Sequence, residues 1–315
     1  MKFINTVKGK IAPEELGFTD IHDHLWKSGG MEVLEDKDFG IDSIKKSSQE
    51  LRSFVDAGGK ALVDMQPIGV GRGINELKAI AQDCDAHVIA ITGFHRGGLY
   101  DKAHFVHRYS LEQIVELVVS EVEEGIEVND FCGPFVEHSD VLPGLVKAGT
   151  SYYKITPLEE KLLKVVARVN QKTDIPIKTH THIGTMGLEQ AKFLKGEGVE
   201  SNKICIGHLD RNADLVYHQQ VLQEGVYVQY DCFARVKYHP LSETMDLIKK
   251  LGEEYGDRIL IGGDWGRASY LKAYNGSPGL EFIPKYLPDL MRDYGISEDL
   301  ITKLFFDNPR EFLAF

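Results

Sequence analysis

The sequence predicts an α/β fold, a single (β/α)8 TIM barrel, in which eight parallel strands form a cylinder and helices cover its outside. Two observations favour this fold class. Apolar runs of strand length alternate eight times with amphipathic helical patterns, and no linker or low-complexity tract interrupts the 315 residues. A barrel of this kind needs about 250 residues, so we expect residues 1–315 to form one domain.

The predicted strands are short apolar runs, most of which end in polar residues. In chain order they cover residues 18–25, 61–65, 87–95, 144–149, 176–182, 203–208, 226–231 and 259–264. Helical periodicity follows at residues 44–55, 74–84, 111–124, 157–173, 187–195, 213–223 and 241–252, and again towards the C-terminus. Thr156, Pro157 and Glu159 have the spacing of a capping box at the fourth helix. Residues 125–143 are irregular, and we expect a long loop there.

Composition and charge exclude several classes of protein. The net charge is −12 and no long basic stripe offsets it, which argues against nucleic acid as the main partner. A few local cations can still hold a small anionic molecule. The N-terminus is too polar for a signal peptide, and about 18 consecutive apolar residues occur nowhere, so we expect no membrane partner. The four cysteines show no CxxC pairing, which fits reduced packing residues in a cytoplasmic protein.

A His-X-His motif ends the first predicted strand. Alternate side chains of a strand share one face, so His22 and His24 can bind one metal ion together. For this motif alone, a pair of surface histidines near a flexible N-terminus is the alternative.

Polar residues at other strand ends strengthen the metal hypothesis. The C-terminal ends of barrel strands converge on one face, where active sites of this fold are built. Those ends carry His22, His24, Lys147, His180, His208 and Asp264. Any one of these residues could be a core histidine whose polar atoms are paired with a neighbour. Such a structural role does not explain why polar residues gather at five strand ends. The pattern therefore predicts a metal site.

Short motifs along nearly the whole chain carry a family resemblance. They are His22-Asp23-His24, Val63-Asp64, Thr92-Gly93-Phe94, Lys147-Ala148-Gly149-Thr150, Thr179-His180-Thr181, Gly207-His208-Leu209-Asp210-Arg211-Asn212 and Gly263-Asp264. Together they resemble the phosphotriesterase-like family of the amidohydrolase superfamily, whose barrels carry a binuclear metal centre at the C-terminal end of the strands.

The resemblance implies two divalent metal ions, expected to be Zn²⁺. By position, His22, His24 and Asp264 would hold the more buried ion, and His180 and His208 the second.

In this family a lysine carboxylated by CO2 usually bridges the two ions. The matching position is Lys147, and Lys154 is the rival. A carbamate supplies two anionic oxygens, whereas a free ammonium cannot sit between two cations. His182 shares the strand face of His180; the family match selects His180, which leaves His182 as a loop or pocket residue.

The resemblance also implies a hydrolytic mechanism. A water molecule shared by two metal ions has a lowered pKa, so a bridging hydroxide exists at neutral pH. Asp264 is expected to take its proton and pass it to the leaving oxygen, which makes Asp264 the catalytic residue.

Cations and phenols in the loops after strands six to eight indicate an anionic substrate. They are Arg211, Lys237, Tyr238, Arg267 and Tyr270. Spacing alone allows them to be solvated surface groups, although barrel enzymes often hold phosphate with the last two loops. The surrounding motifs resemble the subgroup that hydrolyses five-membered lactones of phosphorylated sugar acids, in which matching positions bind the phosphate. His95 and Cys232 depart from the pattern of acyl-homoserine lactonases.

We therefore expect a hydrolase that opens the 1,4-lactone of a phosphorylated sugar acid, an aldono-1,4-lactone 5-phosphate. One alternative is another carboxylic-ester or lactone hydrolase with weak phosphotriesterase activity. A second alternative is a non-catalytic barrel that binds a sugar phosphate. A homodimer is left open as a further partner.

Overall fold

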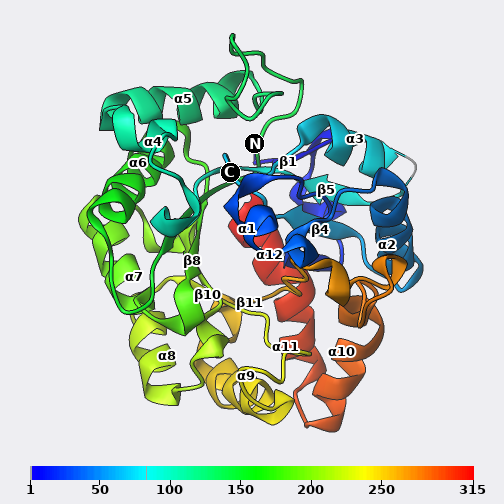
Figure 1. Cartoon of the computed structure of the whole chain (residues 1–315). Helices are drawn as coiled ribbons and strands as arrows, with labels where there is room; N and C mark the ends of the chain where they lie inside the picture. The colour runs from blue at the N-terminus through cyan, green and yellow to red at the C-terminus, as the bar shows by residue number, and fades with distance from the viewer. Residues whose placement is uncertain (1, 83) are drawn as a thin grey trace.

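A ring of parallel strands lies at the centre of the computed structural model, which describes residues 2–82 and 84–315. Its strands are β3 (Thr19–Asp23), β4 (Ala61–Asp64), β5 (His87–Ile89), β6 (Ile91–Gly93), β7 (Leu145–Thr150), β8 (Ile177–Thr181), β9 (Ile204–Gly207), β10 (Tyr227–Tyr230) and β11 (Ile259–Ile261). Only Ala90 separates β5 from β6, so these two form one of eight strand positions. Figure 1 shows most of the helices arranged around the ring. The predicted TIM barrel is confirmed.

The register of the parallel strands determines which residues lie side by side at the polar strand ends. Lys147 of β7 lies opposite Gly93 of β6. His180 of β8 lies between Gly149 of β7 and Gly207 of β9. A Cβ atom on Gly149 would come within 3.2 Å of the His180 Cβ, so glycine leaves room for the imidazole there.

The helices follow the predicted periodicity closely. They are α1 (Gly30–Glu35), α2 (Ile44–Asp56), α3 (Ile74–Gln82), α4 (Phe105–Arg108), α5 (Leu111–Glu124), α6 (Pro157–Thr173), α7 (Gly187–Gly196), α8 (Leu215–Leu222), α9 (Leu241–Tyr255), α10 (Phe282–Asp293), α11 (Glu298–Thr302) and α12 (Asn308–Leu313). The capping box of α6 is confirmed, because Thr156 Oγ1 accepts from Glu159 N and Glu159 Oε2 accepts from Thr156 N. Within residues 2–82 and 84–315, no helix combines the length and apolar character that a membrane span requires.

An N-terminal hairpin, which the sequence did not predict, packs at one end of the barrel. β1 (Ile4–Thr6) pairs antiparallel with β2 (Gly9–Ile11). Ile4, Leu16 and Leu313 are fully buried, and they form one apolar cluster with side chains of the barrel strands. The segment 4–16 is therefore part of the core, which argues against the alternative that the histidines following it lie near a flexible segment.

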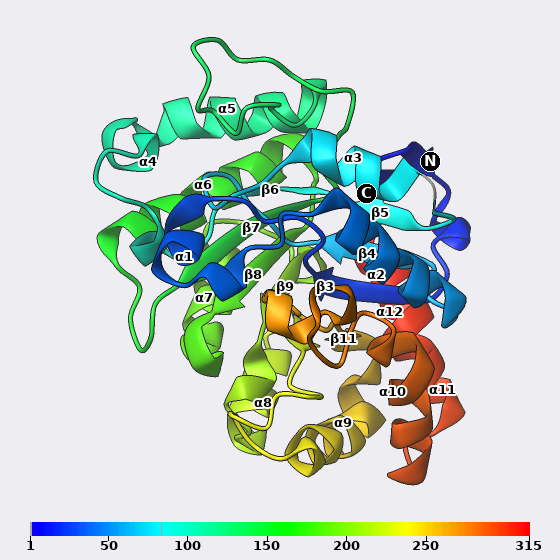
Figure 2. The same cartoon turned by 45° about the vertical axis from the view of Figure 1, so that its right-hand side comes forward.

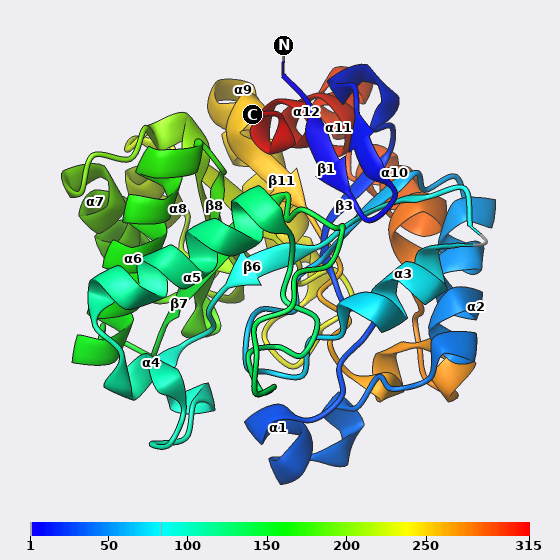
Figure 3. The ribbon, with the colours of Figure 1, turned by 90° about the horizontal axis from the view of Figure 1, so that it is seen from above.

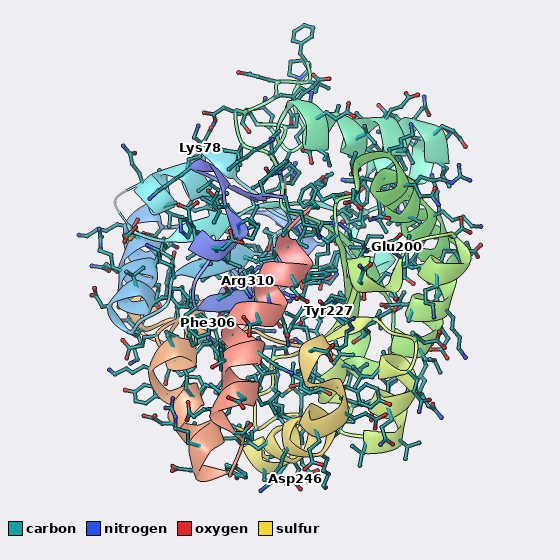
Figure 4. The ribbon with its side chains drawn as sticks, turned by 180° about the vertical axis from the view of Figure 1, so that it is seen from behind. Lys78, Glu200, Tyr227, Asp246, Phe306 and Arg310 are labelled. Atoms are coloured by element: carbon teal, nitrogen blue, oxygen red, sulfur yellow. The ribbon has the colours of Figure 1, made fainter. Side chains whose placement is uncertain are left out.

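The two ends of the barrel differ. Figure 3 shows both chain termini at one end and α1, which follows β3, at the other. Figure 4 views the end with the termini, where Arg310 of α12 and Tyr227 of β10 line the same hollow. Asn308 Nδ2 of α12 donates to the Ile259 carbonyl at 2.7 Å and ties this helix to the start of β11. The polar strand ends lie at the α1 end.

The irregular segment 125–143 is anchored by buried charges. Figure 2 shows it beside α5, at the edge of the barrel. Arg72 makes two hydrogen bonds to Glu121, of 3.0 and 2.7 Å, and lies 3.1 Å from Asp130 Oδ1. Glu127 N donates to Glu121 Oε1 at 2.9 Å. This network joins the segment to α5 and to the loop after β4.

Candidate metal centre

His22, His24 and Asp264 meet where the first and last strands of the ring end. The Nε2 atoms of His22 and His24 lie 3.5 and 3.2 Å from Asp264 Oδ1. Asp264 has a left-handed φ of 47°, and its backbone N–H donates to the His22 carbonyl at 2.7 Å. The three side chains offer ligand atoms within 4.8 Å of one another. Two imidazoles and a carboxylate at this separation fit one metal ion.

His180 and His208 lie beside this group, at the ends of β8 and β9. Their ring centroids are 4.7 Å apart, and the His208 ring is also 4.7 Å from the His22 ring. His180 Nε2 is buried with no hydrogen-bond partner among the described residues, which is costly unless something binds it. His208 Nδ1 donates to the Asp231 carboxylate, which leaves Nε2 available. Both rings therefore fit a second ion.

Lys147 is buried on β7, and its Nζ donates to the Met65 carbonyl at 2.8 Å. Burial lowers the pKa of Lys147 to about 7, although the Asp264 carboxylate opposes the shift. Roughly half of the amine is then unprotonated at neutral pH, and the unprotonated amine is the form that reacts with CO2. Lys154 is exposed and does not line the cavity that contains the other residues.

The strand-end histidines are uncharged at neutral pH. Burial lowers the pKa of His24 and His208 to about 4, and that of His22 and His180 also falls well below its usual value. Burial alone would raise the pKa of Asp264, but the Arg235 guanidinium and nearby imidazoles hold it well below its usual range. The centre therefore presents neutral imidazoles and an ionised carboxylate, which are the protonation states that bind cations.

All of these side chains line one cavity of about 220 Å³. Its walls also carry an excess of positive charge. The cations are Lys27, Arg96, Lys147, Arg211, Arg235, Lys237 and Arg267, and the carboxylates are Glu32 and Asp264. In a chain of net charge −12, a cleft with these walls concentrates positive potential and attracts anions.

The five predicted phosphate-binding residues all line this cavity. Arg211 donates to Asp231 at 3.0 and 3.2 Å, and its guanidinium lies 5.2 Å from the Tyr238 ring. Lys237 Nζ lies 5.0 Å from the same ring. Arg267 lines the cavity and pairs with Asp36 (2.6 Å) and Asp38 (3.3 Å). The sequence did not predict these aspartate partners of Arg211 and Arg267. Of the three cations, Lys237 therefore has the least compensated charge.

Several polar residues of the site were not predicted as members of it, among them Asp231, Arg235 and Arg96. Asp231 follows β10 and is fully buried, and its position after an apolar strand could have identified it. Arg235 Nη1 donates to Asp264 Oδ2 at 2.7 Å, from a loop without periodicity. Arg96 also lines the cavity. His182, predicted as a loop or pocket residue, lines the cavity at the start of a 3-10 turn.

A family model described as the phosphotriesterase family matches residues 2–313. The chain belongs to the phosphotriesterase family. It is 38% identical over 325 residues to a phospho-furanose lactonase of Mycoplasmopsis agalactiae, covering 100% of this chain and 92% of that protein. The solved amidohydrolase of Mycoplasma synoviae has a TM-score of 0.96 at 38% identity, covering 100% and 92% of the two chains. A lactonase of Listeria monocytogenes has a TM-score of 0.92 at 35% identity, with 99% of each chain covered.

Phosphotriesterase-family proteins are binuclear metal enzymes, and the strand ends of this member carry histidine and aspartate groups that can bind metal. The chain is accordingly a hydrolase that acts on ester bonds of small molecules.

Proposed function

We propose that this phosphotriesterase-family chain opens the 1,4-lactone of a phosphorylated sugar acid. One observation carries the proposal: among the described residues, the histidine and aspartate cluster shares a cavity of about 220 Å³ with Lys147, six further cations and a single further carboxylate, Glu32. An ester carbonyl and a phosphate on one small molecule would match these two features. The relatives named phospho-furanose lactonase support the same substrate class.

Two divalent cations, Zn²⁺ by our proposal, would be held by His22, His24 and Asp264 and by His180 and His208. Lys147, carboxylated on Nζ, would join the two groups of ligands. When bound, the two cations would supply a water acidified enough to lose a proton at neutral pH and would polarise the ester carbonyl.

Asp264 is the proposed proton carrier. Its low pKa keeps it ionised, so it can accept the proton of the attacking water and pass it to the leaving ring oxygen. Arg235 donates to one carboxylate oxygen, and His24 lies 3.2 Å from the other. The two contacts fix the orientation of the carboxylate, which a proton relay requires.

The phosphate is proposed to bind beside β10 and β11. Lys237 and Arg211 supply positive charge around the Tyr238 ring, and Arg267 and Tyr270 line the adjoining wall. A charge-assisted contact contributes about 1.5–3 kcal/mol. Two such contacts would favour the phosphorylated lactone at least about 100-fold in kcat/KM.

A matched pair of lactones tests this function. Metal-loaded protein is given one aldono-1,4-lactone with and without a 5-phosphate, and acid release is followed with a pH indicator. We expect a kcat/KM for the phosphorylated lactone at least about 100-fold higher, because the phosphate contacts are made only with that substrate. Equal rates on both lactones, or no hydrolysis of either, would contradict the proposal.

A further inference from the structure

The cavity has cations on two opposite walls. With β5 and β6 counted as one strand, β6 holds the third position of the ring and β10 the seventh. Third and seventh positions of an eight-stranded ring face each other across its axis. Arg96 follows β6, and Lys237 follows β10, so their loops lie on opposite sides of the histidine cluster.

Arg96 is held in place but its charge is not compensated. Its backbone N–H donates to His95 Nδ1 at 2.8 Å, and the next residue, Gly97, donates to Glu159 Oε1 at 3.0 Å. The Arg96 side chain is half-buried, and its guanidinium has no acceptor or carboxylate partner in residues 2–82 and 84–315. A donor group without an acceptor, on the wall of a cavity, is suited to a ligand.

The other cavity cations are already engaged. Lys27 pairs with Glu32 at 3.2 Å, and Arg235 with Asp264 at 2.7 Å. Lys147 donates to a backbone carbonyl at 2.8 Å. Arg211 and Arg267 have the aspartate partners described above. Within the described residues, this leaves Arg96 and Lys237 as the cavity cations whose charged groups have no oxygen partner.

His182 adds a second polar group to the Arg96 wall. It follows β8 and lines the cavity. Thr185 Oγ1 donates to the His182 carbonyl at 2.8 Å, which holds the turn. The ring of Tyr152, from the loop after β7, lies 6.1 Å from the His182 ring. The loops after β6 and β8 thus contribute Arg96 and His182 to the cavity, and the loop of Arg96 lies opposite that of Lys237.

The shape of a five-membered sugar lactone matches two such walls. The carbonyl carbon C1 lies between C2 and the ring oxygen, and the arm that carries the phosphate leaves from C4, beyond that oxygen. When the carbonyl faces the histidine cluster and the phosphate faces Lys237, the hydroxyls on C2 and C3 face the other way. That direction is the side of the cavity lined by Arg96, and His182 lines the cavity between the two sides.

We propose that Arg96, with His182, forms a subsite that binds the C2 and C3 hydroxyls of the lactone ring. The guanidinium donates to the hydroxyl oxygens, and the imidazole offers one ring nitrogen to a hydroxyl. This subsite rests on the proposed function, and it makes Arg96 the residue that distinguishes a sugar lactone from a deoxygenated one. Lys237 distinguishes the phosphorylated lactone.

A comparison of three proteins on three lactones tests the subsite. Wild type, Arg96→Met and Lys237→Met are assayed on the 5-phosphorylated lactone, on its 2,3-dideoxy analogue and on the unphosphorylated sugar lactone. Met keeps most of the side-chain volume and removes the charge and the donors. We expect wild type to prefer the hydroxylated over the dideoxy phosphate about 10- to 100-fold in kcat/KM. Arg96→Met should lose this preference and keep the preference for phosphate.

The control variant should behave in the opposite way. Lys237→Met should lose most of the preference for phosphate and keep the preference for hydroxyls. Arg96→Lys, which keeps the charge and three donors, should restore part of the hydroxyl preference. Metal content, measured for each variant, should equal that of wild type.

Two results would overturn the subsite. In the first, Arg96→Met slows the hydroxylated and dideoxy phosphates equally, which is the mark of a structural role. In the second, Arg96→Met loses the preference for phosphate, which assigns Arg96 to the phosphate site. If wild type hydrolyses no phosphorylated lactone, the proposed function itself fails, and the subsite with it.

Discussion

Asp264 owes its position to the two glycines before it. A Cβ atom on Gly262 would lie 2.9 Å from the His22 backbone nitrogen, so only glycine lets the chain pass so close to β3. A Cβ on Gly263 would lie 2.5 Å from Asp23 Oδ2. The chain then turns into the left-handed conformation at Asp264 and directs the carboxylate towards the histidines. Gly-Gly-Asp after an apolar strand is therefore a local sequence pattern that indicates this position of the aspartate, and the reason is steric.

His24 offers a test of how burial controls protonation at the centre. Burial lowers its pKa to about 4, whereas an unfolded histidine titrates near 6.5. Between these values the unfolded chain binds more protons than the folded one, so His24 disfavours folding as the pH falls through this window. Lowering the pH from 7.5 to 5.0 should therefore reduce the free energy of unfolding by about 2 kcal/mol through His24.

The measurement is urea unfolding of the metal-free protein and of His24→Gln at both pH values. Wild type should lose about 2 kcal/mol more than the variant on going to pH 5.0, because glutamine does not titrate. Titrating groups that do not contact His24 affect both proteins alike and cancel in the difference. The same loss in both proteins would mean that His24 is not held neutral.

At the scale of elements, strands place the metal-binding groups and loops place the cations. β3, β7, β8 and β9 carry or directly precede ligand candidates on a rigid sheet. The loop after β4, by contrast, is held by the buried ion pair between Arg72 and Glu121. Its Met65 carbonyl accepts from Lys147, so this ion pair stabilises the loop beside the centre.

Replacing Arg72 tests this anchoring. The Glu121 side chain is fully buried, and Arg72→Met would leave it without its cationic partner. We expect a loss of about 3–5 kcal/mol in the free energy of unfolding, measured with denaturant. Lys78→Met is the matched control, because Lys78 pairs with Asp140 at an exposed position and should cost less than about 1 kcal/mol. Similar losses in the two variants would show that the buried network does not hold the segment.

At the scale of the whole molecule, the features that could be predicted from the sequence are those that depend on patterns among neighbouring residues. Strand periodicity, helix periodicity and the capping signal at Thr156 each reside in a few neighbouring residues, so the barrel and the helix bounds could be predicted. The gathering of His22, His180, His208 and Asp264 at one end followed from the barrel rule. All four line one cavity.

The features that could not be predicted depend mostly on contacts between segments that are far apart in the sequence. Arg235 contacts Asp264, and Arg267 contacts Asp36 and Asp38, across loops whose paths no periodicity fixes. The β1–β2 hairpin was missed because its strands have only three residues each. A single domain over residues 1–315, a homodimer and a cytoplasmic location stay predictions.

The central claim is that the strand ends of this barrel hold two divalent cations. Anomalous diffraction from crystals of the protein loaded with Zn²⁺ tests it most directly. We expect one peak among His22, His24 and Asp264, a second beside His180 and His208, and density for a carboxylated Lys147 between them. No peak at these residues, or a single peak at the neighbouring Asp210, Asp231 and Cys232, would contradict the account.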